Sequence, residues 1–175
     1  MVKFDDPKPG FKWPVAFTHQ IEAPPESVWA AISMPGNLEL CHPFCEKNPV
    51  EKWPGAESRD EVHYASGRVL ERRFSRWIEG IGYDLTIGRR GGESSFVSWR
   101  IAAIDDRACI LRIAVYPHVL QGVPSVFRWL PHRLRLRPLL ESYLSSVVRG
   151  VEWYVMRDEP VPSNQFGSHP WFSAN

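Results

Sequence analysis

The sequence predicts an α+β fold in which a curved antiparallel sheet of seven strands wraps around a long C-terminal helix, with two short helices after the first strand. Three patterns support this prediction. A strand pattern near the start of the chain passes through two prolines into a helix pattern. Short alternating segments separated by turn residues then extend to Tyr116, and apolar residues at helical spacing fill the range from Pro138 to Arg157.

The first strand and the first helix are joined at Ile21–Trp29. Residues 15–21 alternate in the period of two that is typical of a half-buried strand. Pro24 and Pro25 end this strand, because proline has no amide hydrogen for the ladder but fits the first turn of a helix. Glu26 then favours the positive end of the helix dipole. The buried stripe of the helix is expected at Val28, Ala31 and Ile32, with Trp29 beside it.

A second short helix is expected at Leu38–His42, and six strands follow it. The six are placed at Asn48–Trp53, Ser58–Tyr64, Val69–Glu79, Gly82–Arg89, Ser95–Ile104 and Ala108–Tyr116. The turns between them are short enough for antiparallel hairpins. Each of the last three strands carries its apolar residues on one face. The inward face of the strand at 69–79 stays open, because apolar and charged side chains share both of its faces.

The final helix is predicted from Pro138 to Arg157, because apolar residues recur there at spacings of three and four. Gly150, near its middle, should weaken the helix by about 0.5–1 kcal/mol relative to alanine. We therefore expect a strand or a ligand to approach Gly150 closely, unless the glycine is simply tolerated. The tail at 159–175 is rich in aromatic residues, which disordered tails usually lack, so we expect it to pack on the body or on a partner.

Length and composition indicate one ordered domain over residues 1–175, with 43% hydrophobic and 13% aromatic residues. The net charge of +1 gives no general attraction to nucleic acid, so nucleic-acid binding is disfavoured. The odd number of cysteines (Cys41, Cys45 and Cys109) and the lack of an apolar signal segment favour a reducing cytoplasm. No apolar run approaches the roughly 20 residues that a membrane-spanning helix needs.

A family resemblance is carried by four segments: Ile21–Trp29, Asn37–Phe44, Gly82–Leu85 and Leu139–Tyr154. Together with the order of the elements, which is that of the helix-grip fold, they resemble the START-like, Bet v 1-like (SRPBCC) superfamily. The similarity is greatest to its bacterial members of the polyketide cyclase and dehydrase type, and it covers most of the chain. It implies a cavity between the sheet and the final helix that accepts a lipid, sterol, quinone, polyketide or other aromatic molecule.

Physical reasoning also favours such a cavity, because a curved sheet packed on one helix leaves a gap unless large side chains fill it. The residues predicted to bind the ligand are His42, Phe44, Tyr83, Leu85, Trp99, Ile113, Tyr116, Tyr143 and Val147. The first functional hypothesis is a carrier or sensor of a hydrophobic small molecule, without a cofactor. One alternative is a cyclase, dehydrase or hydrolase that uses His42, His63 or Glu71 as acid or base. The other is a protein-interaction module with a vestigial pocket.

A metal site is the first chemical alternative to simple packing. Cys41, His42 and Cys45 are ligand types that zinc prefers, and Cys109 is a fourth. The spacing lacks a second paired motif and reverses the order of the haem-attachment motif. We therefore predict local packing and no metal.

Acid–base catalysis is the second chemical alternative. His63 lies beside Glu61, and Glu71 lies beside two arginines, so both positions carry groups that transfer protons. Alternating charge is also typical of the solvent face of an antiparallel sheet, and we expect His63 and Glu71 on that face. Tyr116 and His118 are placed either at the mouth of the cavity or in a turn.

The segment at 118–137 is predicted as an inserted basic and apolar loop or short helices. It contains Arg128, Arg133, Arg135 and Arg137 and no acidic residue. This composition suits a cover over the cavity, a contact within a homodimer, or contact with an anionic membrane. We expect the first two ahead of membrane contact through Phe127–Arg137.

Overall fold

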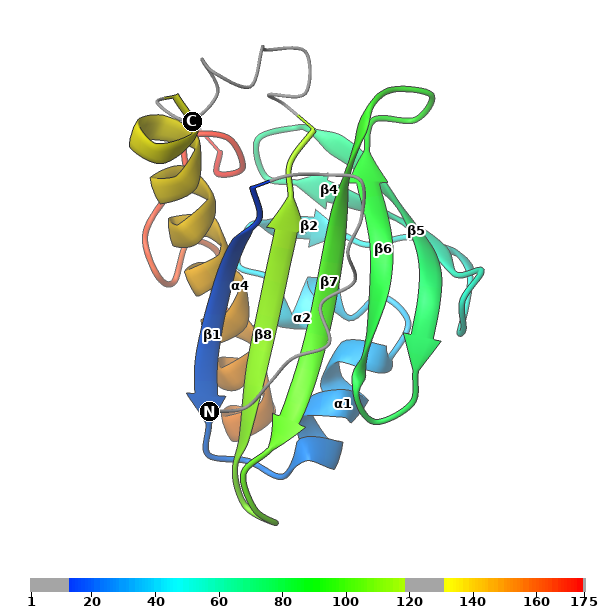
Figure 1. Ribbon diagram of the computed structural model, residues 1–175, viewed down its shortest axis with the longest axis vertical. Helices are drawn as coiled ribbons and strands as arrows, with labels where there is room; N and C mark the ends of the chain where they lie inside the picture. The colour runs from blue at the N-terminus through cyan, green and yellow to red at the C-terminus, as the bar shows by residue number, and fades with distance from the viewer. Residues whose placement is uncertain (1–12, 119–130, 175) are drawn as a thin grey trace.

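A computed structural model describes residues 13–118 and 131–174 of the chain. The strands are β1 (Val15–Ile21), β2 (Cys45–Lys47), β3 (Val50–Lys52), β4 (Arg59–Tyr64), β5 (Val69–Ile78), β6 (Gly82–Gly88), β7 (Ser94–Ala103) and β8 (Cys109–Tyr116). The helices are α1 (Pro25–Ser33), α2 (Leu38–Cys41), the π-helical turn η1 (His132–Leu136) and α4 (Arg137–Arg157). They are labelled in Figure 1, apart from η1 and β3.

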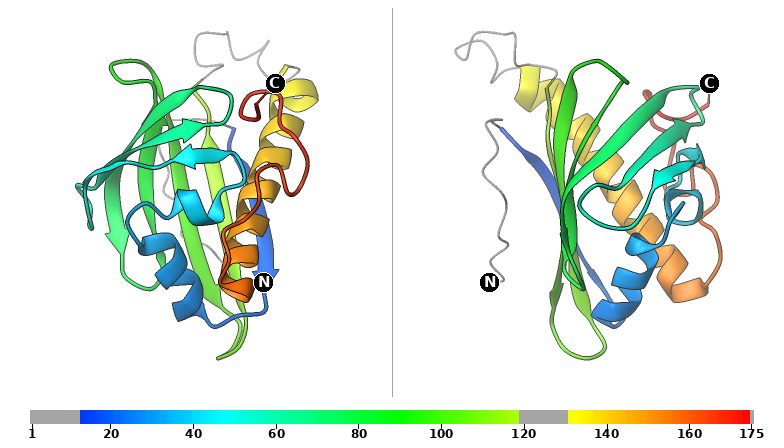
Figure 2. Two further views of the ribbon diagram at one scale, coloured as in Figure 1. Left: turned by 180° about the vertical axis from the view of Figure 1, so that it is seen from behind. Right: turned by 90° about the vertical axis from the view of Figure 1, so that its right-hand side faces the viewer.

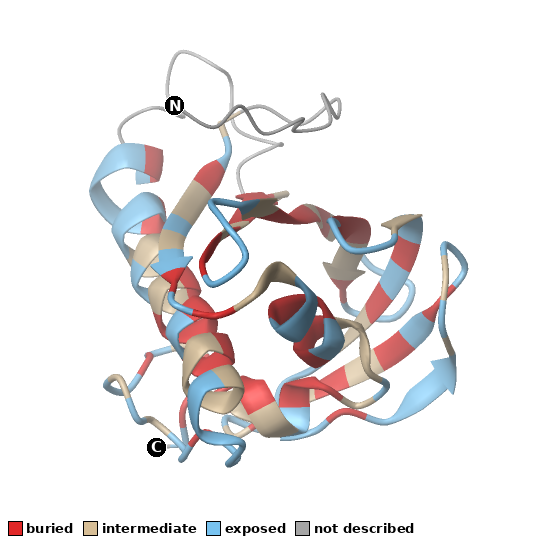
Figure 3. Cartoon of the chain, turned by 90° about the horizontal axis from the view of Figure 1, so that it is seen from below, coloured by how far each residue is buried: buried red, intermediate tan, exposed pale blue. Residues whose placement is uncertain are grey.

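The strands form one antiparallel sheet in the order β1-β8-β7-β6-β5-β4-β2, with β3 also paired to β4. The sheet is strongly curved, and α1, α2 and α4 lie on its concave side (Figures 1 and 2). Buried positions of α4 face the sheet, whereas its exposed positions face outward (Figure 3). The predicted α+β architecture, with a sheet wrapped around the C-terminal helix, is confirmed.

The join between β1 and α1 forms as the sequence predicts. Pro25 occupies the first turn of α1, and Glu26 is the acidic residue of that turn. The buried side chains of the helix are Val28, Trp29, Ala31 and Ile32. Because Trp29 Nε1 also donates a hydrogen bond to Glu79 Oε1 (2.8 Å), α1 is tied to the far end of β5.

The strand predicted at 48–53 forms only at Val50–Lys52 (β3), and an additional short strand, β2, precedes it, so the sheet has eight strands rather than seven. Asn48 separates them, because its groups bond across the fold instead of along a ladder. Its amide nitrogen donates to Glu39 Oε1 (2.6 Å), and its side-chain nitrogen donates to the Glu61 carbonyl oxygen (2.8 Å). Pro49 follows and has no amide hydrogen to offer a neighbouring strand.

The sequence leaves the inward face of β5 undecided. In the structure, the residues that point inward change from even to odd positions within the strand. Phe74 pairs with Leu85, but Arg76 pairs with Asp84, so Ser75 is an extra residue in a β-bulge. Phe74 and Trp77 therefore both point inward, although they are three residues apart. Simple alternation cannot place both residues on one face.

Gly150 is closely approached, as expected, but by the backbone of α2 and not by a strand or a ligand. An added Cβ at Gly150 would lie 2.2 Å from the Cys41 carbonyl oxygen and 3.0 Å from Pro43 Cδ. Only glycine allows α2 and α4 to cross at this distance. The Val161 amide, just after α4, also donates to the Leu40 carbonyl oxygen (2.8 Å), which fixes the same crossing.

The C-terminal segment returns along the body to the turn between β4 and β5. The Ser66 amide donates to the Phe172 carbonyl oxygen (3.1 Å), and Ser66 Oγ donates to the Trp171 carbonyl oxygen (2.9 Å). The ring of Phe172 packs 4.4 Å from that of Tyr64, measured between centroids.

Most of the predicted inserted segment, including Arg128 and the start of Phe127–Arg137, lies outside the described residues. The part that is described, His132–Leu136, is the π-helical turn that runs into α4. In residues 13–118 and 131–174, no helix is long and apolar enough to cross a membrane.

Candidate ligand cavity

A cavity of about 500 Å³ lies between the concave face of the sheet and α4. Its volume falls within the range of roughly 300–1,000 Å³ that is typical of small-molecule sites. The apolar lining residues are Leu38, Val62, Leu70, Leu85, Ile87, Val97, Trp99, Ile113, Val115, Leu136, Leu140, Leu144, Val147, Trp171 and Phe172. The polar lining residues are His42, Tyr64, Arg68, Arg72, Arg89, Glu93, Ser95, His118 and Tyr143. The cavity is thus an apolar chamber with a small number of polar groups.

The mouth of the cavity lies at the β4–β5 and β6–β7 turns, because the lining residues there are exposed. Arg68 belongs to the first turn, and Arg89 and Glu93 to the second. His118 joins them after β8, where its Nδ1 lies 2.8 Å from Ser95 Oγ. The polar residues at this end contrast with the apolar interior.

Aromatic residues close the opposite end. The ring of Tyr83 lies between that of Trp77, with centroids 5.6 Å apart, and that of Trp99, also at 5.6 Å. Trp29 and Trp53 pack edge-on against Trp77. The bulge in β5 makes this end compact, because it turns Trp77 toward the other rings.

A chain of hydrogen bonds runs along the wall formed by α2, β4 and α4. The Phe44 amide donates to His42 Nδ1 (3.2 Å), and His42 Nε2 lies 2.9 Å from Tyr143 Oη. Tyr143 Oη in turn lies 3.0 Å from Tyr64 Oη. Phe172 packs over both tyrosine rings. The chain links three polar lining residues that are distant in sequence.

Burial sets the charge state of these three side chains. It lowers the pKa of His42 to about 3, and the positive charge of Arg72 adds to this effect. Burial raises the pKa of Tyr64 to about 12 and that of Tyr143 well above its ordinary value. All three are therefore neutral near pH 7.

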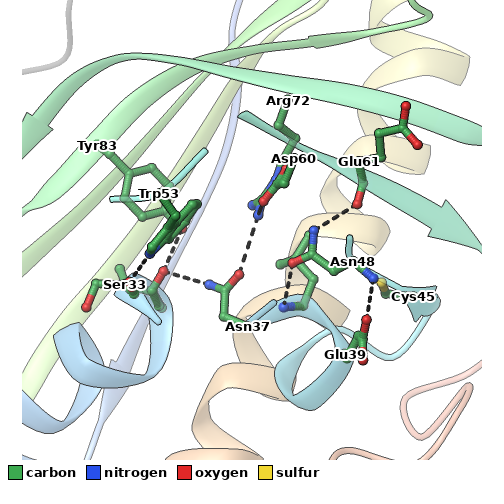
Figure 4. Close-up of polar contacts among 12 residues, drawn as sticks. Ser33, Asn37, Glu39, Cys45, Asn48, Trp53, Asp60, Glu61, Arg72 and Tyr83 are labelled. Carbon is green, nitrogen blue, oxygen red and sulfur yellow. Dashed lines mark hydrogen bonds and ion pairs between the residues drawn. The ribbon is translucent and has the colours of Figure 1, made fainter. Parts of the chain in front are cut away.

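A buried ion pair stands beside the chain of hydrogen bonds. Arg72 Nε donates to Asp60 Oδ1 (2.7 Å), and Arg72 Nη2 donates to Asp60 Oδ2 and to Asn37 Oδ1 (3.4 Å). Burial opposes the charge on Arg72, but the Asp60 carboxylate outweighs it and raises the pKa of the guanidinium. Asn37 Nδ2 also donates to the Ile32 carbonyl oxygen (2.6 Å), so the pair connects β4 and β5 to the end of α1 (Figure 4).

No family model matches the sequence, and no curated protein matches it. Solved structures do share its fold. A START superfamily protein from Mycobacterium smegmatis is similar with a TM-score of 0.64 and 13% identity, over 82% of this chain and 97% of that one. Norcoclaurine synthase from Thalictrum flavum, as a point mutant with a transition-state analogue, has a TM-score of 0.59 and 11% identity, over 83% and 95%. The chain has the START-like, Bet v 1-like (SRPBCC) fold.

A third protein of similar structure is DynU16, from the dynemicin biosynthetic locus. It has a TM-score of 0.63 and 15% identity over 84% of this chain, which spans 48% of the length of DynU16. Identities at this level show a common fold. The resemblance found in the sequence is confirmed for the START-like fold.

Six of the residues predicted to bind a ligand line the START-like cavity: His42, Leu85, Trp99, Ile113, Tyr143 and Val147. The other three do not line it. Tyr83 is buried in the closed end, and Phe44 packs behind His42 against Tyr143 and His169. Tyr116 lies on the opposite face of β8 from Ile113 and Val115, and its ring contacts Phe96.

The sequence reasoning missed Tyr64 and Arg72, which line the cavity from β4 and β5. A signal for Tyr64 was present, because Val62 and Tyr64 alternate with the polar residues Glu61 and His63. Arg72 had no such signal, since an arginine is rarely expected on an inward face.

The two outer acid–base candidates, His63 and Glu71, are not in the cavity. His63 and Glu71 lie on the opposite face of the sheet from Val62 and Leu70, which line the cavity. His63 Nε2 lies 3.0 Å from Glu61 Oε2, and Glu71 Oε2 accepts a hydrogen bond from Arg73 Nε (2.8 Å). The enzyme alternative that used His63 or Glu71 in the cavity was wrong on their position.

Cys41 and Cys45 donate hydrogen bonds to backbone carbonyl oxygens, Cys41 to Asn37 (3.1 Å) and Cys45 to Lys47 (3.2 Å). Burial raises the pKa of both thiols to about 12. In the described part of the chain, no three His, Cys, Asp or Glu side chains are grouped as metal ligands.

The low pKa of His42 makes stability depend on pH. Its pKa is about 3 in the folded protein and 6.5 in an unperturbed chain. Below pH 6.5, His42 binds a proton in the unfolded chain but not in the folded protein. The contribution of the neutral imidazole to the free energy of unfolding is therefore complete above pH 6.5 and is lost as the pH falls toward 3. The slope from this group is at most about 1.4 kcal/mol per pH unit.

We expect His42→Gln to flatten this slope in urea unfolding measured between about pH 7 and pH 4. Burial also lowers the pKa of His169, which contributes in the same direction, so part of the slope should remain. Tyr83→Phe is the control, because the buried Tyr83 hydroxyl has a raised pKa and stays protonated throughout this range, so the variant should keep the wild-type slope. Equal slopes of the free energy of unfolding against pH for wild type and His42→Gln would contradict the assignment of this pH dependence to His42.

Proposed function

We propose that this protein binds and carries a hydrophobic small molecule, such as a lipid, quinone, polyketide or other aromatic compound. The observation that supports the proposal most directly is the apolar cavity of about 500 Å³ between the sheet and α4. Burial of apolar ligand surface against its lining supplies the affinity. The three free cysteines, Cys41, Cys45 and Cys109, suit a reducing compartment such as the cytoplasm.

Binding without turnover is favoured by the polar groups of the lining. Within the described residues, the two lining imidazoles bond to hydroxyl groups, His42 to Tyr143 and His118 to Ser95. Neither forms the pair with a carboxylate that general acid–base catalysis would use. The open volume also argues against an interaction module with a filled pocket.

Native mass spectrometry of gently purified protein tests the proposal. We expect a hydrophobic molecule to co-purify with the protein at one copy per chain. Alternatively, protein from which the ligand has been removed should take up one N-phenyl-1-naphthylamine per chain. A protein that is reproducibly empty and takes up none of this probe would refute the proposal.

Filling the cavity should remove binding. Val147 is 2% exposed on α4 and lines the cavity, so the indole of Val147→Trp would occupy the space of the ligand. We expect probe affinity to fall at least about tenfold, because the ligand and the indole exclude each other. Val69→Trp introduces the same side chain at the start of β5, where Val69 is 44% exposed. The control should bind the probe as wild type does, and equal binding by both variants would place the probe elsewhere.

A further inference from the structure

The hydrogen bonds around His42 fix where its proton lies. The Phe44 amide, 3.2 Å from His42 Nδ1, can only donate, so Nδ1 accepts. The imidazole is neutral, and its one proton is therefore on Nε2. Since Nε2–H can only donate, Tyr143 Oη accepts the bond at 2.9 Å.

One of the two tyrosine hydroxyl groups therefore has a proton that is not used in a hydrogen bond. Tyr64 and Tyr143 carry two hydroxyl protons, and the bond of 3.0 Å between them uses one. Within the described residues, the second proton has no acceptor, whichever tyrosine holds it. Both side chains line the cavity, and Phe172 covers both rings from the side of the tail.

An unused donor in a buried site favours an acceptor on the ligand, because a buried polar group without a partner is unfavourable by roughly 1–3 kcal/mol. A neutral oxygen suits this position better than a carboxylate. The nearby Arg72 is already neutralised by Asp60, and the other two arginines of the lining, Arg68 and Arg89, are exposed at the mouth.

We infer that the Tyr64–Tyr143 pair is a recognition site for a neutral acceptor oxygen, so that the preferred ligand is an apolar molecule bearing a ketone or quinone carbonyl. This inference rests on the proposed binding function and specifies its ligand class. The pair offers the ligand one hydroxyl proton, because both hydroxyl groups stay protonated near neutral pH and only one of their two protons is used between them.

A matched pair of probes tests the inference. 9-Fluorenone and fluorene differ by a carbonyl in place of a methylene group, and both are apolar tricyclic molecules. In competition with N-phenyl-1-naphthylamine, we expect the wild-type protein to bind the ketone about three to ten times more tightly, the effect of one neutral hydrogen bond.

Variants assign the preference to the tyrosine pair. Either single change, Tyr64→Phe or Tyr143→Phe, leaves one hydroxyl with an unused proton, so the preference should persist. The double variant removes both hydroxyls but also leaves the His42 Nε2 proton without its acceptor, so the variant expected to bind the two probes equally is Tyr64→Phe/Tyr143→Phe combined with His42→Leu. Tyr83→Phe is the matched control, because Tyr83 Oη bonds to the Ile32 carbonyl oxygen (3.4 Å) away from the cavity lining.

The carbonyl stretching band of bound 9-fluorenone gives a second readout that needs no variant. With wild-type protein, the band should lie at lower frequency than in hexane, because a hydrogen bond weakens the carbonyl bond. Equal affinities together with an unshifted band would overturn the inference but leave the binding function intact. Failure of both fluorene and fluorenone to bind, together with an empty protein, would count against the proposed function itself.

Discussion

Asp60→Ala is expected to lower the free energy of unfolding by about 3–5 kcal/mol, the usual effect of removing one member of a buried ion pair. Asp60 and Arg72 are direct partners on β4 and β5, and their side chains are 0% and 3% exposed. Without the carboxylate, the guanidinium would remain in the wall of the cavity with one long hydrogen bond to Asn37 Oδ1 (3.4 Å) and the ring of Phe74 at 5.2 Å. Urea unfolding at neutral pH measures the change.

An exposed ion pair provides the control for Asp60→Ala. Arg137 Nε donates to Glu141 Oε1 at 2.7 Å on the surface of α4, with side chains 57% and 40% exposed. Glu141→Ala should lower stability by only about 0.5 kcal/mol, because water replaces the lost partner. A loss below about 1 kcal/mol for Asp60→Ala would mean that Arg72 finds another partner or that water reaches it.

Replacing both members of the pair distinguishes the stability that the ion pair contributes from the destabilisation caused by one buried charge without a partner. Asp60→Leu combined with Arg72→Met leaves no buried charge, and replacements of this kind are often neutral or stabilising. We expect the double variant to recover most of the stability that Asp60→Leu alone loses. A double variant as unstable as the single one would show that Arg72 is needed for packing as well as for charge.

Gly150→Ala is expected to lower the free energy of unfolding by about 2 kcal/mol or more, although alanine is the better helix former. The intrinsic preference of a helix for alanine is about 1 kcal/mol. The new Cβ would lie 2.2 Å from the Cys41 carbonyl oxygen, and overpacking of this kind typically costs about 1–3 kcal/mol, sometimes more. Since the obstacle is backbone, α2 and α4 would have to move apart.

The same α4 helix supplies the control for Gly150→Ala. Ser142 is exposed, so Ser142→Ala changes helix preference without a close neighbour and should raise stability by about 0.5 kcal/mol or less. In denaturant unfolding, a loss of stability for Gly150→Ala together with a gain for Ser142→Ala would support the close crossing of α2 and α4. A Gly150→Ala protein as stable as wild type would show that α2 shifts at little cost.

The parts of the fold that could be predicted from the sequence depend on local chemistry. The prolines at 24 and 25 break a strand and open a helix wherever they occur, and the spacing of apolar residues in α4 needs no knowledge of its neighbours. The split between β2 and β3 was missed because Asn48 bonds to Glu39 and Glu61, which only the finished fold brings near. Local patterns carry no information about such partners.

The candidate site could be predicted in part for the same reason. Leu85, Trp99 and Ile113 follow regular alternation on central strands, so their inward direction could be read from the sequence. Tyr116 was expected in the cavity because it ends the last strand, but it lies on the opposite face of β8 from Ile113. The Tyr64–Tyr143 pair depends on how β4 and α4 lie in space, and the sequence positions of the two residues give no sign of it.

The β-bulge at Ser75 determines how firmly the closed end of the cavity is packed. With regular pairing beyond Phe74, Trp77 would point to the convex face, and its indole would no longer fill the space between Trp29 and Tyr83. Tyr83, which lies between Trp77 and the lining residue Trp99, would then lose the ring that packs behind it. In this protein the packing of the closed end therefore depends on the backbone register of one strand, so an insertion or deletion of one residue there would loosen that end without changing any side chain of the lining.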